Sequence, residues 1–357
     1  MMNPRFHTTA IAAVAILAAA PFVQAADLPS TGEEPVVVFG GWGGSVQKQM
    51  YEFCFDEFTA KTGIKVEYFN TARLGKLKAQ VESGQPEMDT TWLNGIEMPA
   101  ATGGNYVQKL DYDVIDKGEL SPNQYNHAFG EYGITFDIFT EAMAYNTNKW
   151  PGDDHPKSWA DFWNVEKFPG PRAMDGRPPL NGAFEAASRA MGIAPKDVYP
   201  IDLDKAYAKL DEIKPHVAIW LKRGSEHVKA MVSEEVDLIL AFSGRIAEAA
   251  RKGAPFRVVP QTYIRTTGSL FVVPAKAKHP RNASLLIGYC ARKEPMAKFA
   301  EARAGAPSNM MAIDLMGKSM VPSNHPSLAD TTVVVDDQWY APRLADLNKQ
   351  WTEWVTR

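Results

Sequence analysis

Cysteine is scarce in this sequence: Cys54 and Cys290 are the only two among 357 residues. Neither belongs to a CxxC motif and no histidines cluster with the spacing of ligands, so no structural zinc or other metal is expected. In an oxidising compartment two cysteines can form a disulfide. Both lie in helical patterns assigned below to the same half of the fold, and two separately buried thiols remain the alternative.

Runs of basic residues are also lacking. The chain has 38 Lys and Arg against 42 Asp and Glu, a net charge of −4. Without a cationic patch, neither nucleic acid nor an anionic membrane is expected as a partner. The glycine-rich turn Gly40–Ser45 lacks the GxGxxG spacing and the P-loop lysine, and no nucleotide or other cofactor is expected.

Catalytic motifs are missing as well. There is no GxSxG or HExxH motif, and the seven histidines are scattered along the chain. The sequence therefore does not predict an enzyme. An exported hydrolase with an unrecognised active site remains the alternative, because a missing motif weakens that class without excluding it.

The one long apolar run lies near the N-terminus, at residues 10–20. Arg5 precedes it and Val23–Ala25 ends it with small residues, the three-part pattern of a secretory signal peptide. The run is too short to span a bilayer. We expect cleavage after Ala25 and a mature protein in the periplasm, diffusing freely because no cysteine follows the cleavage site to carry a lipid.

Removing residues 1–25 leaves 332 residues, which predicts two lobes of roughly 150 residues rather than one core. Strands are predicted at 35–39, 64–69 and 88–92, with helices at 45–62 and 74–82 between them. This alternation favours a mostly parallel sheet with helices on both faces. Further strands are predicted at 136–146, 236–242, 257–260 and 269–273, and further helices at 158–163, 181–191, 202–214, 227–233, 243–252, 282–303 and 336–354.

Aromatic and polar side chains follow several of these strands. Trp42 comes after the first strand, Trp92 and Asn94 end the third, and Phe242–Arg245 follows a strand in the second half. Ligands of open α/β sheets bind at the carboxyl ends of the strands. Two such sheets facing each other make a cleft with these residues on its walls.

Several segments occur in an order and spacing typical of a known family. They include Thr62–Val66 after the first helix, Ala144–Asn146 before Ser158–Trp163, the Phe242–Gly244 turn, and Val273–Ala277. With these segments the chain resembles, over nearly all its mature length, periplasmic solute-binding proteins of the spermidine/putrescine-type ABC importers. The resemblance implies an α/β, type II periplasmic-binding fold whose two lobes, each a mostly parallel sheet flanked by helices, close over a ligand.

The resemblance also implies how the chain divides. Lobe one takes residues 35–135 plus 269–320, and lobe two takes 136–268 plus 321–357. The chain then crosses between lobes near Phe136, Gly268 and Val321.

Members of the family bind polyamines between aromatic walls and acidic residues. Carried over to this chain, Trp42, Trp92 and Phe242 are wall candidates, while Asp175 and Glu185, with Asp89, are candidates for an amine. Thr266–Gly268 stands where the family has an aromatic residue and an aspartate, so one ammonium partner is lost. The expected ligand-binding residues are Trp42, Arg73, Trp92, Asn94, Asp175, Glu185, Phe242, Ser243, Arg245 and Thr267.

Arginines at these positions point to a different ligand from a simple polyamine. Arg245 follows the Phe242–Gly244 turn, and Arg73 or Arg265 is its expected partner in clamping a carboxylate. The sequence thus predicts a monomeric receptor that captures a small nitrogen-containing organic solute and delivers it to an ABC permease. The solute is polyamine-like or, from the arginines, bears a carboxylate like an amino acid.

Overall fold

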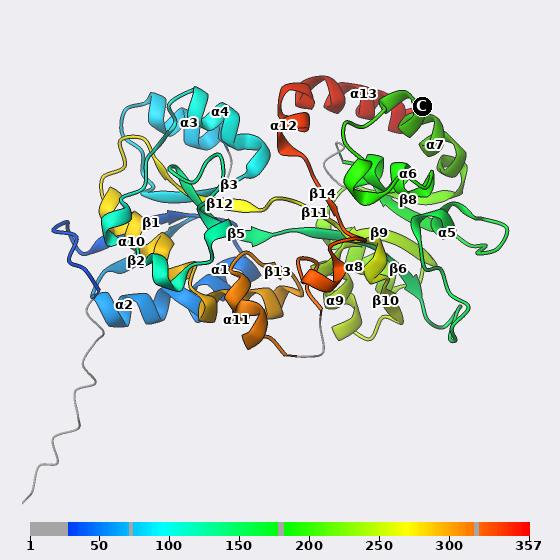
Figure 1. Ribbon diagram of the computed structural model, residues 1–357, viewed down its shortest axis with the longest axis horizontal. Coiled ribbons are helices and arrows are strands. Elements are labelled where there is room, and N and C mark those ends of the chain that lie inside the picture. The colour runs from blue at the N-terminus through cyan, green and yellow to red at the C-terminus, as the bar shows by residue number, and fades with distance from the viewer. Residues whose placement is uncertain (1–27, 71–73, 178–181, 318–320) are drawn as a thin grey trace, which may run out of the picture.

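A computed structural model describes residues 28–70, 74–177, 182–317 and 321–357 (Figure 1). The expected signal peptide and Arg73 lie outside these ranges. Two lobes lie side by side, each built on one seven-stranded sheet with helices against it, and strands run between them through the middle of the molecule (Figure 1). Within the described residues, no helix is long and apolar enough to cross a membrane.

The sheet of lobe one has the strand order β13-β5-β12-β3-β1-β2, with β4 paired to β12. Its strands β1, β2 and β3 are parallel, and β12 is antiparallel to both of its main neighbours, β3 and β5. The strands are β1 (Val36–Gly40), β2 (Lys65–Phe69), β3 (Thr90–Asn94), β4 (Val107–Gln108), β5 (Gly133–Ile138), β12 (Ser269–Pro274) and β13 (Ala306–Pro307). The main helices are α1 (Ser45–Met50), the π-helical turn η1 (Tyr51–Phe55), α2 (Asp56–Thr62), α3 (Leu74–Glu82), η2 (Gly95–Glu97), α4 (Met98–Gly103), α10 (Pro280–Cys290), α11 (Lys293–Arg303) and η9 (Met310–Leu315).

The sheet of lobe two has the order β14-β11-β6-β9-β7-β8, with β10 paired to β6. The parallel strands β7, β8 and β9 mirror the parallel half of lobe one. The strands are β6 (Thr140–Asn146), β7 (Arg172–Asp175), β8 (Val217–Leu221), β9 (Leu238–Phe242), β10 (Phe256–Val258), β11 (Ile264–Arg265) and β14 (Val333–Val334). The main helices are α5 (Trp159–Trp163), α6 (Ala183–Ala190), α7 (Leu203–Ile213), α8 (Gly224–Val232), α9 (Ser243–Arg251), α12 (Asp337–Tyr340), η11 (Ala341–Arg343) and α13 (Leu344–Thr356).

The chain passes between the two sheets three times. The predicted long strand 136–146 is two strands, because β5 pairs in the sheet of lobe one and β6 in that of lobe two, and Phe139 is the switch between them. Residues 266–268 join β11 of lobe two to β12 of lobe one, and the chain returns to lobe two between β13 and β14. A hinge at these crossings would need only a few residues to change φ and ψ.

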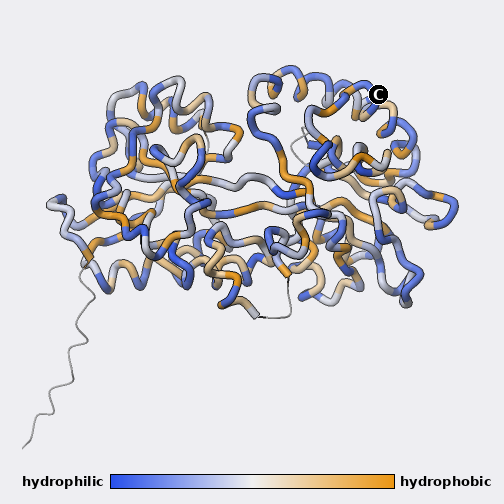
Figure 2. Tube along the Cα trace, viewed as in Figure 1, coloured by the Kyte–Doolittle hydropathy of each residue, from blue (hydrophilic) through white to orange (hydrophobic). Residues whose placement is uncertain are grey.

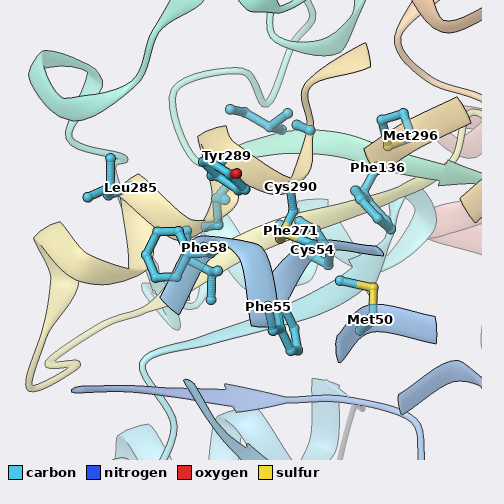
Figure 3. Close-up of a cluster of buried hydrophobic side chains, with 14 of the residues drawn as sticks. Met50, Cys54, Phe55, Phe58, Phe136, Phe271, Leu285, Tyr289, Cys290 and Met296 are labelled. Carbon is cyan, nitrogen blue, oxygen red and sulfur yellow. A yellow bond between two sulfur atoms is a disulfide. The ribbon is translucent and has the colours of Figure 1, made fainter. Parts of the chain in front are cut away.

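Each lobe has its own apolar core, and the orange, apolar stretches in Figure 2 follow the central strands. In lobe one, a disulfide joins Cys54 of η1 to Cys290 of α10, with Cα atoms 5.4 Å apart. Figure 3 shows this bond among buried rings, including Phe58 and Tyr289. The sequence left the pairing open, and the structure resolves it in favour of the disulfide.

The cores are not wholly separate. Ile96 of η2, in lobe one, belongs to the apolar cluster of lobe two that includes Trp339 and Tyr340 of α12. On the other side of the crossing strands, Ser243 at the start of α9 donates a hydrogen bond to the carbonyl oxygen of Ala304 just after α11, at 3.0 Å. The lobes are therefore in contact on both sides of the crossing.

Candidate functional site

A cavity of about 540 Å³ lies between the lobes, where α1 and α11 of lobe one approach α8 and α9 of lobe two (Figure 1). The crossing segment Asp137–Thr140 forms part of its lining. The other lining residues are Ser45, Val46, Gln49, Arg177, Gly224, Phe242, Ser243, Gly244, Arg245, Glu248, Arg251, Ala302, Arg303 and Gly305. Both lobes contribute residues to this cavity. A ligand that favours closure of the lobes must contact both of them, and this cavity allows it to do so.

The carboxyl ends of β1 and β9, and the helices that follow them, lie at this cavity. β1 is followed by a glycine turn in which Gly44 has φ 71°, and α1 begins at Ser45. In lobe two, β9 ends at Phe242 and α9 begins at once with Ser243. Strand–turn–helix units of this kind bring loop residues and helix N-termini to the carboxyl edge of a sheet, where ligands of α/β folds bind.

Guanidinium groups outnumber carboxylates in the cavity lining. Four arginines line it, Arg177, Arg245, Arg251 and Arg303, against two acids. Arg245 Nη1 lies 2.8 Å from Glu248, and Arg303 Nε lies 3.6 Å from Asp137. Burial raises the pKa of Asp137, and the charge of Arg303 opposes that rise. The excess of positive charge favours an anionic group in a ligand.

Arg177 is the arginine most firmly held in place. Its Nε lies 2.9 and 3.0 Å from the two carboxylate oxygens of Asp175, and its Nη2 bonds to the same carboxylate. Burial pushes the pKa of Asp175 upward, but the hydrogen bonds from Arg177, with His227 Nε2 3.4 Å away, outweigh it and leave the pKa lowered. Asp175, predicted to meet an amine, instead forms an ion pair with Arg177.

Aromatic rings provide the apolar surface of the cavity. Phe139 on the crossing strand and Phe242 at the end of β9 have ring centroids 6.4 Å apart, and Arg177 lies over the Phe242 ring at 5.7 Å. Trp42, expected as a wall, is 39% exposed in the turn after β1. Its carbonyl oxygen accepts a hydrogen bond from Tyr68 at 2.7 Å, which fixes the turn.

Three of the expected ligand residues have structural partners instead. Trp92 is 3% exposed among Phe39, Phe136 and Phe271, so its assignment to a cleft wall was wrong. Its side chain faces the core because alternate residues of a strand point to opposite faces of the sheet. Glu185 is buried in lobe two, where the hydroxyls of Tyr199 and Tyr340 donate to it, and burial raises its pKa. Asp89 bonds to the backbone of Val38 and His279 inside lobe one.

Other expected residues lie at the junction of the lobes, outside the cavity lining. The Asn94 side chain accepts a hydrogen bond from Ser269 at 3.0 Å, and Thr267 donates to the carboxylate of Asp337. Arg265, on β11, is half-buried, and burial lowers its pKa. Phe242, Ser243 and Arg245 line the cavity.

Two residues at this junction were not predicted from the sequence. Arg177 follows β7, a four-residue strand without the long β-branched run that marks β1 and β9. Asp337 lies in a segment where the spacing of the tryptophans predicted a packed helix and no functional role. The usable signal for Arg177 was its position two residues after Asp175, at the carboxyl end of a strand.

Comparison with known proteins identifies the family. Residues 54–324 match the family described as bacterial extracellular solute-binding protein. The chain is 25% identical over 337 residues to a gamma-aminobutyric acid-binding protein of Pseudomonas aeruginosa, covering 90% of each chain. It is 24% identical to the spermidine/putrescine-binding periplasmic protein of Salmonella typhimurium, covering 91% of this chain and 92% of that one.

Solved structures agree with these relatives. The structure of the Atu4243 GABA receptor superposes with a TM-score of 0.79 at 28% identity, covering 89% of this chain and 97% of the other. MotA from A. tumefaciens B6, in complex with glucopine, gives 0.73 at 25% identity, covering 89% and 99%. The two-lobed α/β architecture is thus that of periplasmic binding proteins. The chain belongs to the bacterial extracellular solute-binding protein family and is the substrate-binding component of an ABC transporter.

Proposed function

We propose that this receptor captures a small nitrogen-containing solute that bears a carboxylate, of the amino acid or ω-amino acid class. The observation that carries the proposal is the inter-lobe cavity with four arginines and two carboxylates. A guanidinium binds a carboxylate through parallel N–H donors, and such charge-assisted bonds are among the strongest in proteins. The receptor is a monomer in the periplasm, binds no nucleic acid, makes no chemical change to the solute and passes it to a membrane permease.

The relatives support this class of solute. One curated relative binds gamma-aminobutyric acid, and a solved neighbour is a GABA receptor, so a carboxylate and an amine occur together in their ligand. A spermidine/putrescine-binding relative keeps the polyamine alternative open. The arginine excess disfavours it here, because two ammonium groups meet like charge in the cavity. The relatives named above are solute-binding proteins, so they give no support to the exported hydrolase.

Capture works by closure of the lobes. Because the cavity takes residues from both lobes, the solute makes its full set of contacts only when they approach each other. A ligand that binds the closed state better than the open state shifts the equilibrium towards closure. The closed form is then the one that the permease meets.

Arg245→Ala tests the carboxylate clamp without disturbing the fold. Arg245 is partly exposed, and its partner Glu248 keeps a second ion pair with Lys252 at 2.9 Å, so the variant leaves no isolated buried charge. We expect binding of the preferred amino acid to weaken about 10-fold, as for the loss of one charge-assisted hydrogen bond. Isothermal titration calorimetry, after a thermal-shift screen of amino acids, ω-amino acids and polyamines, measures the change.

The matched control is Arg257→Ala, which removes the same charge from an exposed position on β10 outside the cavity. Equal affinity of the Arg245→Ala and Arg257→Ala variants rules out the clamp. Stabilisation of the receptor by polyamines but by no carboxylate-bearing solute contradicts the proposed ligand class.

A further inference from the structure

A fully buried histidine of lobe two lies behind the cavity. His227, in the first turn of α8, is 0% exposed. In the part of the chain that the structure describes, neither of its ring nitrogens has a hydrogen-bond partner of normal geometry. A buried polar group without such a partner costs free energy. Phenylalanine or leucine at this position avoids that cost, so packing alone does not account for a histidine.

The imidazole of His227 lies against the carboxyl ends of two neighbouring strands. Its Nε2 is 3.4 Å from Oδ2 of Asp175, the last residue of β7. Its ring also stacks on Phe242, at the end of β9, with ring centroids 5.9 Å apart and an angle of 28° between the planes. Phe242 lines the cavity, and so does Arg177, which is bonded to Asp175. A single layer of side chains thus separates His227 from the cavity.

Asp175 and Arg177 hold each other, but their mutual bonds do not fix the pair to the rest of the lobe. Arg177 Nε lies 2.9 and 3.0 Å from the two carboxylate oxygens, and the Arg177 backbone N–H donates to Oδ1 at 2.9 Å. These bonds all lie within three consecutive residues. Among the described residues, His227 is the one group from another element within 4 Å of this carboxylate in an ion pair or hydrogen bond. The imidazole therefore connects the pair to α8.

Other charges near Arg177 do not hold its guanidinium in place. Hydrogen bonding to Asp175 raises the pKa of Arg177 most, and the charges of Glu141 and Glu226 add to that rise from a distance. Glu226 accepts a hydrogen bond from the backbone N–H of Lys222 at 2.7 Å instead. The guanidinium also lies over the Phe242 ring at 5.7 Å. Such a contact orients a guanidinium less strictly than two parallel hydrogen bonds to a carboxylate do.

We propose that His227 is a positioning residue of the solute site. With its proton on Nε2, the imidazole holds the carboxylate of Asp175, and Asp175 in turn holds the guanidinium of Arg177 at the cavity. The inference rests on the proposed function, in which arginines of the cavity bind the carboxylate of the solute. A side chain that is held in its binding geometry before the solute arrives loses less conformational freedom on binding, which raises the affinity.

Two substitutions separate positioning from packing. His227→Phe keeps a ring against Phe242 and removes the N–H, whereas His227→Gln loses the ring and places an amide N–H close to the position of Nε2. Calorimetry with 4-aminobutyrate is expected to show about 10-fold weaker binding for His227→Phe and affinity within about threefold of wild type for His227→Gln. A role in packing alone predicts the opposite order of affinities. Equal affinity of wild type and His227→Phe overturns the proposal.

His155→Phe is the matched control. His155 also lies in lobe two and stacks on an aromatic ring, that of Tyr145, with centroids 4.4 Å apart, but it does not line the cavity. The same substitution there keeps the stacking and is expected to leave the affinity for 4-aminobutyrate unchanged. A loss as large as that of His227→Phe would show a general effect of replacing a histidine in this lobe, and the positioning role would be wrong.

A double-mutant cycle tests whether His227 acts through Asp175. Asp175→Asn keeps the volume of the side chain, removes its charge and is expected to weaken 4-aminobutyrate binding about 10-fold. If His227 acts only through this carboxylate, adding His227→Phe to Asp175→Asn causes no further loss. Losses that multiply to about 100-fold in the double variant show that the two residues act independently, which contradicts the proposal.

A crystal structure of the unliganded His227→Phe variant gives a readout that needs no solute. We expect the Asp175 carboxylate to turn and the Arg177 guanidinium to leave the Phe242 ring. If binding weakens while Arg177 stays in place, the positioning role is wrong and the proposed function stands. If wild type binds putrescine and no carboxylate-bearing solute, the proposed function fails, and the place of Arg177 in this variant alone decides whether His227 positions it.

Discussion

Replacing Gly244 by valine is expected to weaken solute binding about 100-fold without unfolding either lobe. Gly244 lies in the first turn of α9, and a Cβ atom there would be 2.6 Å from the carbonyl oxygen of Arg303, at the end of α11. That oxygen belongs to the backbone, so it cannot turn away as a side chain can. The added bulk acts between lobes, which keeps them apart at the cavity they share.

The size of the effect follows from the cost of overpacking, about 3 kcal/mol, which corresponds to about 100-fold in affinity. In the open receptor the lobes are apart and the valine does not clash. The substitution therefore leaves the free energy of folding unchanged and makes closure less favourable. Calorimetric titration with the preferred solute measures the affinity, and small-angle scattering shows whether the liganded variant still closes.

Ala250→Val provides the control for this substitution. It places valine on the same helix, at an exposed position away from α11, and reproduces any loss of helix propensity. If both variants bind equally well, close approach at Gly244 is not needed for capture.

Removal of the disulfide is expected to lower the free energy of unfolding by about 3–5 kcal/mol. The bond joins cysteines 236 residues apart, and a cross-link over so long a loop restricts the unfolded chain strongly. Both sulfurs lie in the core of lobe one, among rings such as Phe58 and Tyr289. The double variant Cys54→Ala, Cys290→Ala, compared with wild type in urea denaturation, measures the loss.

Two controls accompany the disulfide prediction. Wild type denatured with a reducing agent should approach the stability of the double variant, because both then lack the cross-link. Solute affinity at low temperature should stay within about twofold of wild type, since neither cysteine lines the cavity. A double variant as stable as oxidised wild type contradicts a stabilising role for the bond.

Local patterns predicted most of the fold. The predicted helix at 74–82 coincides with α3, and the first three strands are shifted by no more than two residues from β1, β2 and β3. These elements have their own hydrophobic periodicity and clear glycine or serine boundaries. The order of strands and helices then sufficed to predict two α/β lobes. The expectation of mostly parallel sheets was wrong, because β12 and β5 in lobe one and β6 in lobe two pair antiparallel with their neighbours.

The failures have a common cause, which is pairing or burial that only the folded chain defines. β7 was missed because Arg172 reads as a surface residue, yet it is 1% exposed and its Nε donates to the carbonyl of Phe162 at 2.9 Å. Periodicity also cannot show that residues on either side of Phe139 pair in different sheets.

The candidate site was predictable only in part. Phe242, Ser243 and Arg245 follow a strong strand signal, and the structure places them on the cavity. Trp92 also lies near the end of a predicted strand, but its side chain points into the core. Adjacent residues of a strand face opposite sides of the sheet, so an error of one residue in the predicted register reverses the expected direction of a side chain. Asp337 comes from 70 residues beyond Thr267, and a contact over that separation leaves no local pattern.

The position of β12 has a consequence for incomplete chains. This strand pairs with both β3 and β5, yet it is reached only at Ser269, long after its neighbours. A polypeptide that stops before Ser269 leaves one side of β3 and both sides of β5 without their backbone partners, because β13 also comes later in the chain. Unpaired strand edges recruit strands from other molecules. Truncated products of this chain are therefore expected to aggregate, and lobe one is complete only when the last quarter of the polypeptide is present.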